Sequence, residues 1–146
     1  MGQGGLFSVT QIASSGLAAE RLRMEVAANN IANANSTRTA DGTPYRRQQV
    51  VFSAAMQKAM GKSIDGDNLT GVTIDGVQDD MSELPKLYSP GHPHADADGF
   101  VTMPNVKLPH EMVDMMTAAR AYEANLKSLQ VFRNMTEQSL SLLKGS

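Results

Sequence analysis

The chain contains no cysteine, so disulfide bonds, thiolate metal sites and thiol nucleophiles are all excluded. It also lacks tryptophan, and aromatic residues make up only 5% of its 146 residues. No run approaches the roughly 18 consecutive apolar residues of a membrane span, so we expect no direct membrane insertion. A buried surface would therefore consist of aliphatic, alanine and methionine side chains, which favours packing of helix on helix.

Neither sign of charge is concentrated along the chain. Thirteen basic residues stand against fifteen acidic ones, which gives a formal net charge of −2. Arg46 and Arg47 beside Tyr45 form too small a basic patch for nucleic-acid binding, and we expect them to form salt bridges or a subunit contact instead. No basic residue precedes Arg21 and no continuous apolar stretch occurs there, which is not the pattern of a cleaved secretory signal.

Composition divides the chain into three zones. Residues 1–35 are rich in alanine and asparagine, and residues 36–108 carry repeated glycine, proline and aspartate turn signals, such as Asp41-Gly42, Asp65-Gly66, Asp75-Gly76 and Asp98-Gly99. Residues 109–146 contain no glycine or proline between Pro109 and Gly145. The pattern predicts a mainly α fold in which two terminal helices form one helical domain around a small β or loop region, with strands near residues 48–52, 71–74 and 100–103.

The first predicted helix, residues 8–34, has two apolar stripes at helical spacing, where an ordinary surface helix has one. A polar strip between them consists of Gln11, Ser14, Arg21, Glu25 and Asn29, with Ala18 among them. Gly16 lies in the middle of this helix, where it costs about 1 kcal/mol relative to alanine unless another helix approaches closely. Two stripes suggest two packing partners.

The second predicted helix begins at Pro109 and carries a heptad pattern. Its members alternate three and four residues apart, and only Arg133 and Thr136 interrupt their apolar character: Met112, Met115, Ala119, Tyr122, Leu126, Leu129, Arg133, Thr136, Leu140 and Leu143. A second stripe contains Ala121, Phe132, Met135 and Leu142. Because the first helix can cover only one seam, the remaining apolar faces predict self-association or docking to partner helices.

Other kinds of site have weak support. The segment His92 to Asp98 offers two imidazoles and two carboxylates, yet no second ligand cluster accompanies it and an exposed loop is the better interpretation. Asp65 to Asn68 is similar to a calcium loop but lacks a closing glutamate. No histidine is tied to Ser14 or Ser15, and no phosphate-binding loop occurs, so we expect no enzyme, no metal and no cofactor.

Two segments carry a family resemblance. Residues 15–36 read SGLAAERLRMEVAANNIANANS, and residues 111–116 and 119–125 read EMVDMM and ARAYEAN. Together with the link Asp98-Gly99-Phe100-Val101 to Pro104-Asn105-Val106, they resemble the flagellar basal-body rod proteins, most closely the proximal-rod branch called FlgC.

The resemblance implies a structural subunit whose terminal helices pair in antiparallel fashion and polymerise into a helical tube that transmits motor torque. It further implies export through the flagellar type III apparatus without a cleaved signal to the rod in the periplasmic space. The partners would be copies of the chain, other rod proteins, and motor-ring or export-gate components at the rod base. The alternative is a soluble helical adaptor that binds one partner helix without polymerising. The predicted assembly interface comprises Ile12, Leu17, Leu22, Met24, Val26, Asn29, Asn30, Ile31, Asn33, Met112, Met115, Tyr122, Asn125, Leu126, Leu129, Phe132 and Leu140.

Overall fold

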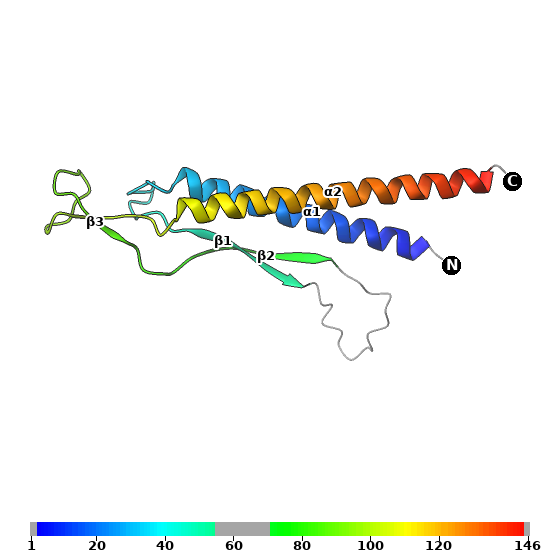
Figure 1. Ribbon diagram of the computed structural model, residues 1–146. Helices are drawn as coiled ribbons and strands as arrows, with labels where there is room; N and C mark the ends of the chain where they lie inside the picture. Colours follow the sequence, from blue (N-terminus) through cyan, green and yellow to red (C-terminus); the bar gives the residue numbers. More distant parts are fainter. Residues whose placement is uncertain (1–2, 55–70, 145–146) are drawn as a thin grey trace, which may run out of the picture. The chain divides into compact units, whose positions relative to one another are not determined.

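The structure, a computed structural model, describes residues 3–54 and 71–144, and the side chains of residues 9–52 and 71–142. Helix α1 spans Gln3–Ala32 and helix α2 spans Leu108–Lys144 (Figure 1). Four strands lie between them in the chain: β1 (Gln48–Ala54), β2 (Val72–Asp79), β3 (Lys86–Tyr88) and β4 (Phe100–Thr102). Two long terminal helices with a small β region between them are the fold class that the sequence predicts.

The chain divides into two compact units. Unit 1 comprises Met1–Arg21, Phe52–Asp75 and Ala118–Ser146, and unit 2 comprises Leu22–Val51 and Gly76–Thr117. Each unit therefore combines part of α1, part of α2 and part of the middle zone. The three predicted zones describe the order along the chain, whereas the units describe which segments pack together.

The ends of both helices follow the sequence signals. After α1 ends at Ala32, the Asn33 side chain donates to the Asn29 carbonyl oxygen at 2.9 Å, and the Ser36 amide donates to the Asn33 carbonyl oxygen at 3.0 Å. Pro109 lies in the first turn of α2, where its missing N–H costs no hydrogen bond. Helix α1 thus ends two residues before the predicted position 34, and α2 begins one residue before the predicted Pro109.

The two helices run antiparallel within unit 2. Arg23 of α1 binds Asp114 of α2 at 2.8 Å, and Asn30, further along α1, binds Glu111, which lies earlier in α2, at 2.9 Å. Among the described residues the buried apolar side chains are small ones: Ala19, Val26, Ala27, Ala34, Val101 and Ala118. Every member of the predicted polar strip of α1 is exposed, so the strip does face solvent in the subunit.

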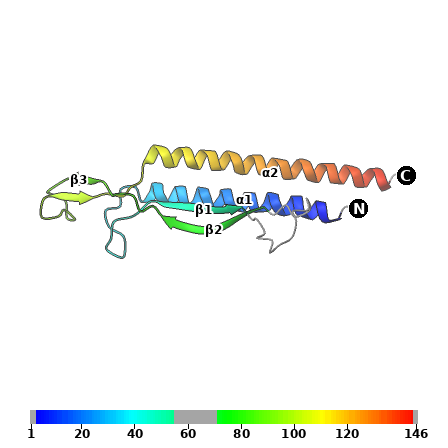
Figure 2. The same cartoon turned by 90° about the horizontal axis from the view of Figure 1, so that it is seen from below.

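Two two-stranded sheets form the β region, β1 with β2 and β3 with β4. Figure 2 shows the β1 and β2 arrows running in opposite directions. All three predicted strands are present, but the turn expected at Asp75-Gly76 is wrong because β2 continues through both residues. Gly76 has a φ of 150°, a value that costs glycine little, so the chain stays extended there. Strand β3 was not predicted, since three residues after a proline carry little signal.

The β3–β4 hairpin depends on Gly99. Lys86, Leu87 and Tyr88 pair in antiparallel register with Thr102, Val101 and Phe100, and the Tyr88 and Phe100 rings meet edge to face at 5.2 Å. Gly99 has a φ of 81°, and a Cβ there would lie 3.1 Å from both the Tyr88 ring and the Pro90 Cβ. Any side chain would therefore be strained both by its backbone angle and by its neighbours.

We predict that Gly99→Ala lowers the free energy of unfolding by about 1–3 kcal/mol, the usual cost of a non-glycine residue in this backbone region. Gly91→Ala is the matched control, because nothing lies within 4 Å of a Cβ at Gly91. Urea unfolding of the two purified variants measures the difference. Equal stability of the two variants would contradict this account of the hairpin.

Candidate functional site

Several members of the apolar row predicted on α2 are exposed rather than buried. Met112, Met115, Leu126 and Leu140 are 54%, 37%, 41% and 53% exposed, whereas Glu111 is 1% exposed and Ala118 is 0% exposed. The positions seven and fourteen residues beyond Ala118, Asn125 and Phe132, are half-buried. We call Glu111, Ala118, Asn125 and Phe132 the inward line of α2. The inward line has the predicted heptad spacing, but each of its members lies one residue before a member of the predicted apolar row, as Asn125 does before Leu126.

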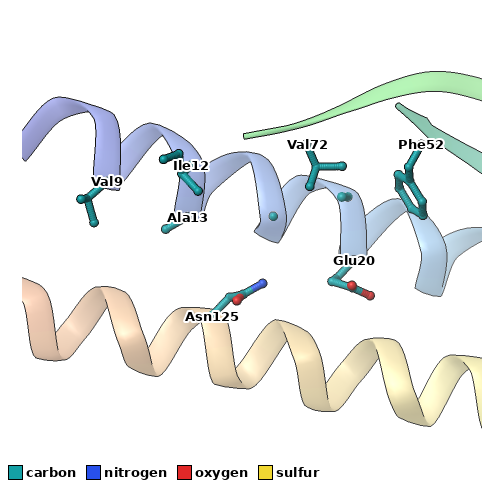
Figure 3. Close-up of a pocket in the computed structure, with 9 residues that line it drawn as sticks. Val9, Ile12, Ala13, Glu20, Phe52, Val72 and Asn125 are labelled. Carbon is teal, nitrogen blue, oxygen red and sulfur yellow. The ribbon is translucent and has the colours of Figure 1, made fainter. Parts of the chain in front are cut away.

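Small and polar residues on the inward line let α1 approach closely in unit 1. A Cβ at Gly16 would lie 3.1 Å from the Asn125 amide nitrogen, so this glycine sits opposite an α2 side chain with little space between them. Figure 3 shows the Asn125 side chain projecting from α2 toward α1. The close helix approach that the sequence suggested at Gly16 is confirmed, and a larger apolar residue at position 125 would not fit in the same way.

Exposed apolar side chains lie on both sides of the inward line. With about 100° per residue, Met112, Met115, Leu126 and Leu140 lie on one side, and we call them the first apolar row. The second apolar row, roughly 100° away on the other side, is Val113, Val131, Met135 and Leu142, which are 52–77% exposed. Helix α2 therefore presents two apolar surfaces that α1 does not cover.

Unit 1 also contains an open apolar groove with a volume of about 650 Å³ (Figure 3). Val9, Ile12, Ala13, Gly16 and Ala19 of α1 form one side of it. Phe52 of β1 and Val72 of β2 add apolar side chains, and Asn125 of α2 closes another side. The middle zone thus supplies part of the lining of a groove whose other walls are the two terminal helices.

The predicted interface residues of α1 are distributed over several environments. Ile12, Leu17, Leu22, Met24, Ile31 and Asn33 are half-buried, Val26 is buried, and Asn29 is exposed. On α2, Tyr122 and Leu129 are half-buried beside the first apolar row. Asn30 is fully buried, and its amide is used inside the subunit. The assembly roles of these residues remain predictions, and Asn30 is placed to hold the subunit together rather than to meet a neighbour.

Asn30 is the centre of a polar cluster in unit 2. Its amide nitrogen donates to the Gln48 carbonyl oxygen at 2.8 Å and to Glu111 Oε2 at 2.9 Å. Its amide oxygen accepts from the Tyr45 hydroxyl at 2.9 Å and from the Gln48 backbone N–H at 2.8 Å. One buried side chain therefore uses all of its hydrogen-bonding capacity to join α1, β1 and α2.

Glu111 carries a buried charge that is paired on several sides. Arg47 Nε donates to Glu111 Oε1 at 2.6 Å, and Arg47 Nη2 lies 3.6 Å from Asp114 Oδ2. Asp114 Oδ1 in turn accepts from Arg23 at 2.8 Å. Glu111 also lies in the first turn of α2, where the helix dipole favours negative charge. Burial of this carboxylate is tolerated because these partners replace its hydration.

The cluster extends to the segment after β2. The Asn105 side chain accepts from the Arg47 backbone N–H at 2.7 Å and donates to the Asp80 carbonyl oxygen at 3.0 Å. Hydrogen bonds from Ser82 lower the pKa of Asp80, and the positive charges of Arg47 and Arg46 lower it further. Arg46 donates to the carbonyl oxygens of Asp80 and Ser82, at 3.3 Å and 3.1 Å. The Arg46-Arg47 pair is thus held within unit 2, with Arg47 forming the expected salt bridges.

Sequence reasoning missed much of this cluster. In the sequence, Glu111 stood out only as part of the motif EMVDMM at residues 111–116, and Tyr45 and Arg47 stood out only as part of a short basic patch. Glu111 lies 64 positions from Arg47 and 81 from Asn30 in the chain, so no local pattern links it to either partner. The only signal for the buried line of α2 was indirect. Glu111 is followed seven positions later by the small residue Ala118, so these two residues lie on the same side of the helix.

The segment His92 to Asp98 forms part of the loop that connects β3 to β4. The His92 and His94 rings meet edge to face at 5.4 Å, and His94 Nδ1 lies 2.8 Å from the Thr37 hydroxyl. His92 Nδ1 accepts from the His94 backbone N–H at 3.1 Å, and Asp96 accepts from the backbone N–H groups of Asp98 and Phe100. Within residues 3–54 and 71–144, no three metal-ligating side chains converge here or elsewhere. Asp65 to Asn68, which we expected to form a turn rather than a calcium site, lie outside the described residues.

The two helix serines have different surroundings. Ser14 donates to the Gln11 carbonyl oxygen and is exposed, whereas Ser15 donates to the Ile12 carbonyl oxygen and also accepts from the Val72 backbone N–H. Both serine hydroxyls thus bind backbone groups, and these bonds stabilise the local structure. In the described part of the chain, neither helix has a stretch that is long and apolar enough to cross a membrane.

Comparisons with known proteins find matching families for both ends of the chain. Residues 11–38 match the family described as "Flagella basal body rod protein", and residues 97–142 match "Flagellar basal body rod FlgEFG protein C-terminal". The flagellar basal-body rod protein FlgC of Borreliella burgdorferi is 41% identical over 97% of this chain and 99% of its own length. The chain belongs to the FlgC family of flagellar basal-body rod proteins.

Other FlgC proteins match the chain over nearly the same extent. The Salmonella typhimurium protein is 42% identical over 94% of this chain and 97% of its own length. The Aquifex aeolicus protein is 34% identical, over 95% and 98%. The family resemblance inferred from the terminal motifs is confirmed, and the chain is a structural component of the flagellar basal-body rod.

For this FlgC family member, we predict that Asn30→Ala lowers the free energy of unfolding by on the order of 3 kcal/mol. The change removes four hydrogen bonds and leaves buried groups of Tyr45, Gln48 and Glu111 with one partner fewer. Asn29→Ala is the control, because Asn29 is exposed. Urea unfolding of both variants decides the matter, and a small effect at Asn30 would show that the cluster does not organise unit 2.

We further predict a pH dependence that comes from Tyr45. Burial, followed by the negative charges of Asp79 and Glu111, raises the pKa of the Tyr45 hydroxyl above its ordinary value of 10.0. The folded state therefore favours the protonated phenol, which donates to Asn30. Its contribution to stability is complete below pH 10.0 and is lost as the pH rises through the raised pKa.

Comparison of the wild type with Tyr45→Phe isolates this contribution from the lysines, which titrate in the same range. The stability difference between the two proteins should be constant at neutral pH and should shrink as the pH rises above about 10. Urea unfolding at a series of pH values provides the measurement. A difference that stays unchanged up to about pH 11.5 would contradict the assignment.

Proposed function

We propose that the chain is a subunit of the proximal part of the rod, where it polymerises through α1 and α2 into a helical tube that transmits motor torque. Its neighbours are copies of itself and other rod proteins, and it meets motor-ring or export-gate components at the rod base. It performs no catalysis. It reaches the rod, in the periplasmic space, through the flagellar type III export apparatus without a cleaved signal peptide.

The observation that carries this proposal is the pair of uncovered apolar rows on α2. Leu126 of the first row and Met135 of the second are 41% and 61% exposed within unit 1. Soluble monomers rarely keep extended apolar surfaces free, and such surfaces mark sites of protein association. Because the rows lie on opposite sides of the inward line, a single partner helix cannot cover both.

Two uncovered rows favour a polymer over a single-partner adaptor. A helix that packs on one additional neighbour needs one apolar stripe beyond the stripe that faces its own subunit. A subunit within a tube has neighbours on more than one side, and each neighbour needs its own surface. The groove in unit 1 adds a third apolar surface, with Ile12 and Val72 in its lining.

Placement in a tube also accounts for the small core of the subunit. The buried apolar side chains among the described residues are four alanines and two valines, which bury little surface. A chain with so small a core gains stability when neighbours cover its exposed rows. The relatives are named as rod proteins, and both observations support a structural role rather than catalysis.

We predict that Leu126→Asp and Met135→Asp each abolish incorporation into the rod, because each places a carboxylate in a packed apolar contact. Asn134→Asp is the matched control, since it adds the same charge at an exposed position that is already polar. Incorporation is measured as the amount of the chain in purified basal bodies, and motility is measured in the same strains. If only one row is sensitive, the single-partner adaptor is favoured instead.

Hydrogen exchange tests the same proposal without mutation. We expect the unit 1 parts of α1 and α2 to exchange quickly in the purified chain and to become protected in isolated basal bodies. Peptides around Asn30 and Glu111 should be protected in both states, because the polar cluster holds them within the subunit. Full protection of the unit 1 helices in the purified chain would favour a self-contained adaptor.

A further inference from the structure

Ser15 joins α1 to the beginning of β2. Its hydroxyl donates to the Ile12 carbonyl oxygen at 2.7 Å and accepts from the Val72 backbone N–H at 3.1 Å. The first bond is an ordinary contact of a helical serine with its own helix. The second bond reaches a residue 57 positions away in the chain, at the first residue of a strand.

Gly71, immediately before β2, rests directly against the same point of α1. A Cβ at Gly71 would collide with the Ser15 hydroxyl oxygen and would lie 3.0 Å from the Ser15 Cβ and 3.1 Å from the Ile12 Cα. Gly71 has no positive φ, so the backbone angle is not what requires glycine here. The requirement is space, because the strand backbone lies against the helix backbone with no room for a side chain.

We propose that Ser15 and Gly71 form a seat that fixes the start of β2 on α1 and thereby positions one wall of the apolar groove. Gly71 permits the close approach, and the Ser15 hydroxyl sets its position by holding the Val72 amide. Val72 lines the groove together with Phe52 of the paired strand β1. Through this seat, the middle zone supplies side chains that line the groove of unit 1.

The consequence for assembly rests on the proposed function, whereas the seat itself does not. If neighbouring subunits use the groove, displacement of β2 removes one of its walls while the helices remain able to form. Ser15 and Gly71 then act as positioning residues, through Val72 and Phe52. Neither of them needs to touch a neighbour for its substitution to reduce incorporation.

The first test uses mutual rescue between the two positions. Gly71→Ala should lose most of its incorporation into basal bodies, because the new methyl group displaces β2. Ser15→Ala should reduce incorporation by a smaller amount, since it removes the one hydrogen bond that holds Val72 but leaves the space for Gly71 intact. The double variant S15A/G71A should regain part of the incorporation that Gly71→Ala loses, because removal of the hydroxyl relieves the collision and leaves the tight contacts of 3.0 Å with the Ser15 Cβ and 3.1 Å with the Ile12 Cα.

The controls are matched to the chemistry of each change. Ser14→Ala removes a hydroxyl that bonds to its own helix in the same way but does not contact β2, and Gly91→Ala adds a methyl group where nothing lies within 4 Å. Both should incorporate as the wild type does. If S15A/G71A is as impaired as Gly71→Ala or more so, the two residues do not share one space and the seat is overturned.

The second test needs no loss of function. Because the chain has no cysteine, an introduced pair provides its only thiols. Ser15→Cys with Val72→Cys should form an intramolecular disulfide in mildly oxidised basal bodies, whereas Ser14→Cys with Val72→Cys should not. Absence of the first cross-link, or equal cross-linking of both pairs, overturns the seat. Failure of the rod proposal gives a different result, namely wild-type incorporation of the Leu126→Asp and Met135→Asp variants.

Discussion

The arrangement of unit 2 depends on one buried amide. Asn30 is fully buried and bonds to Tyr45, Gln48 and Glu111 at distances between 2.8 and 2.9 Å. Hydrogen bonds are directional, so four of them at one side chain leave little freedom in where the three segments meet. The bond to Asn30 turns Glu111 toward α1, and the buried charge of Glu111 is then balanced by the positive charge of Arg47.

Once Glu111 faces inward, the remaining faces of α2 are determined. Residues at heptad spacing from it, Ala118 and Asn125, also face α1, and the strongly apolar residues are turned to the two sides. The subunit therefore uses polar contacts and small residues for its own packing and leaves its large aliphatic side chains uncovered. A chain that had to be stable alone would place those groups in the opposite way.

The sequence was sufficient to predict the helices, three of the four strands, the polar strip of α1 and the close approach at Gly16. These features depend on local spacing, turn residues and composition, which a single sequence contains. It was not sufficient to predict which heptad line of α2 is buried. A hydrophobicity pattern predicts that Leu126 is buried and Asn125 is exposed, whereas Leu126 is exposed and Asn125 is half-buried. The seat at Gly71 was also missed, since a glycine before a strand does not reveal that a helix lies against it.

The polar cluster has a mechanical consequence for the proposed role in transmitting torque. Apolar surfaces can slide along each other at little cost, because their attraction depends on buried area rather than direction. A shift of α1 along α2 by one helical turn would separate Asn30 from Glu111 and Arg23 from Asp114 at the same moment. Unit 2 therefore resists sliding of α1 along α2 through directional bonds that must break together.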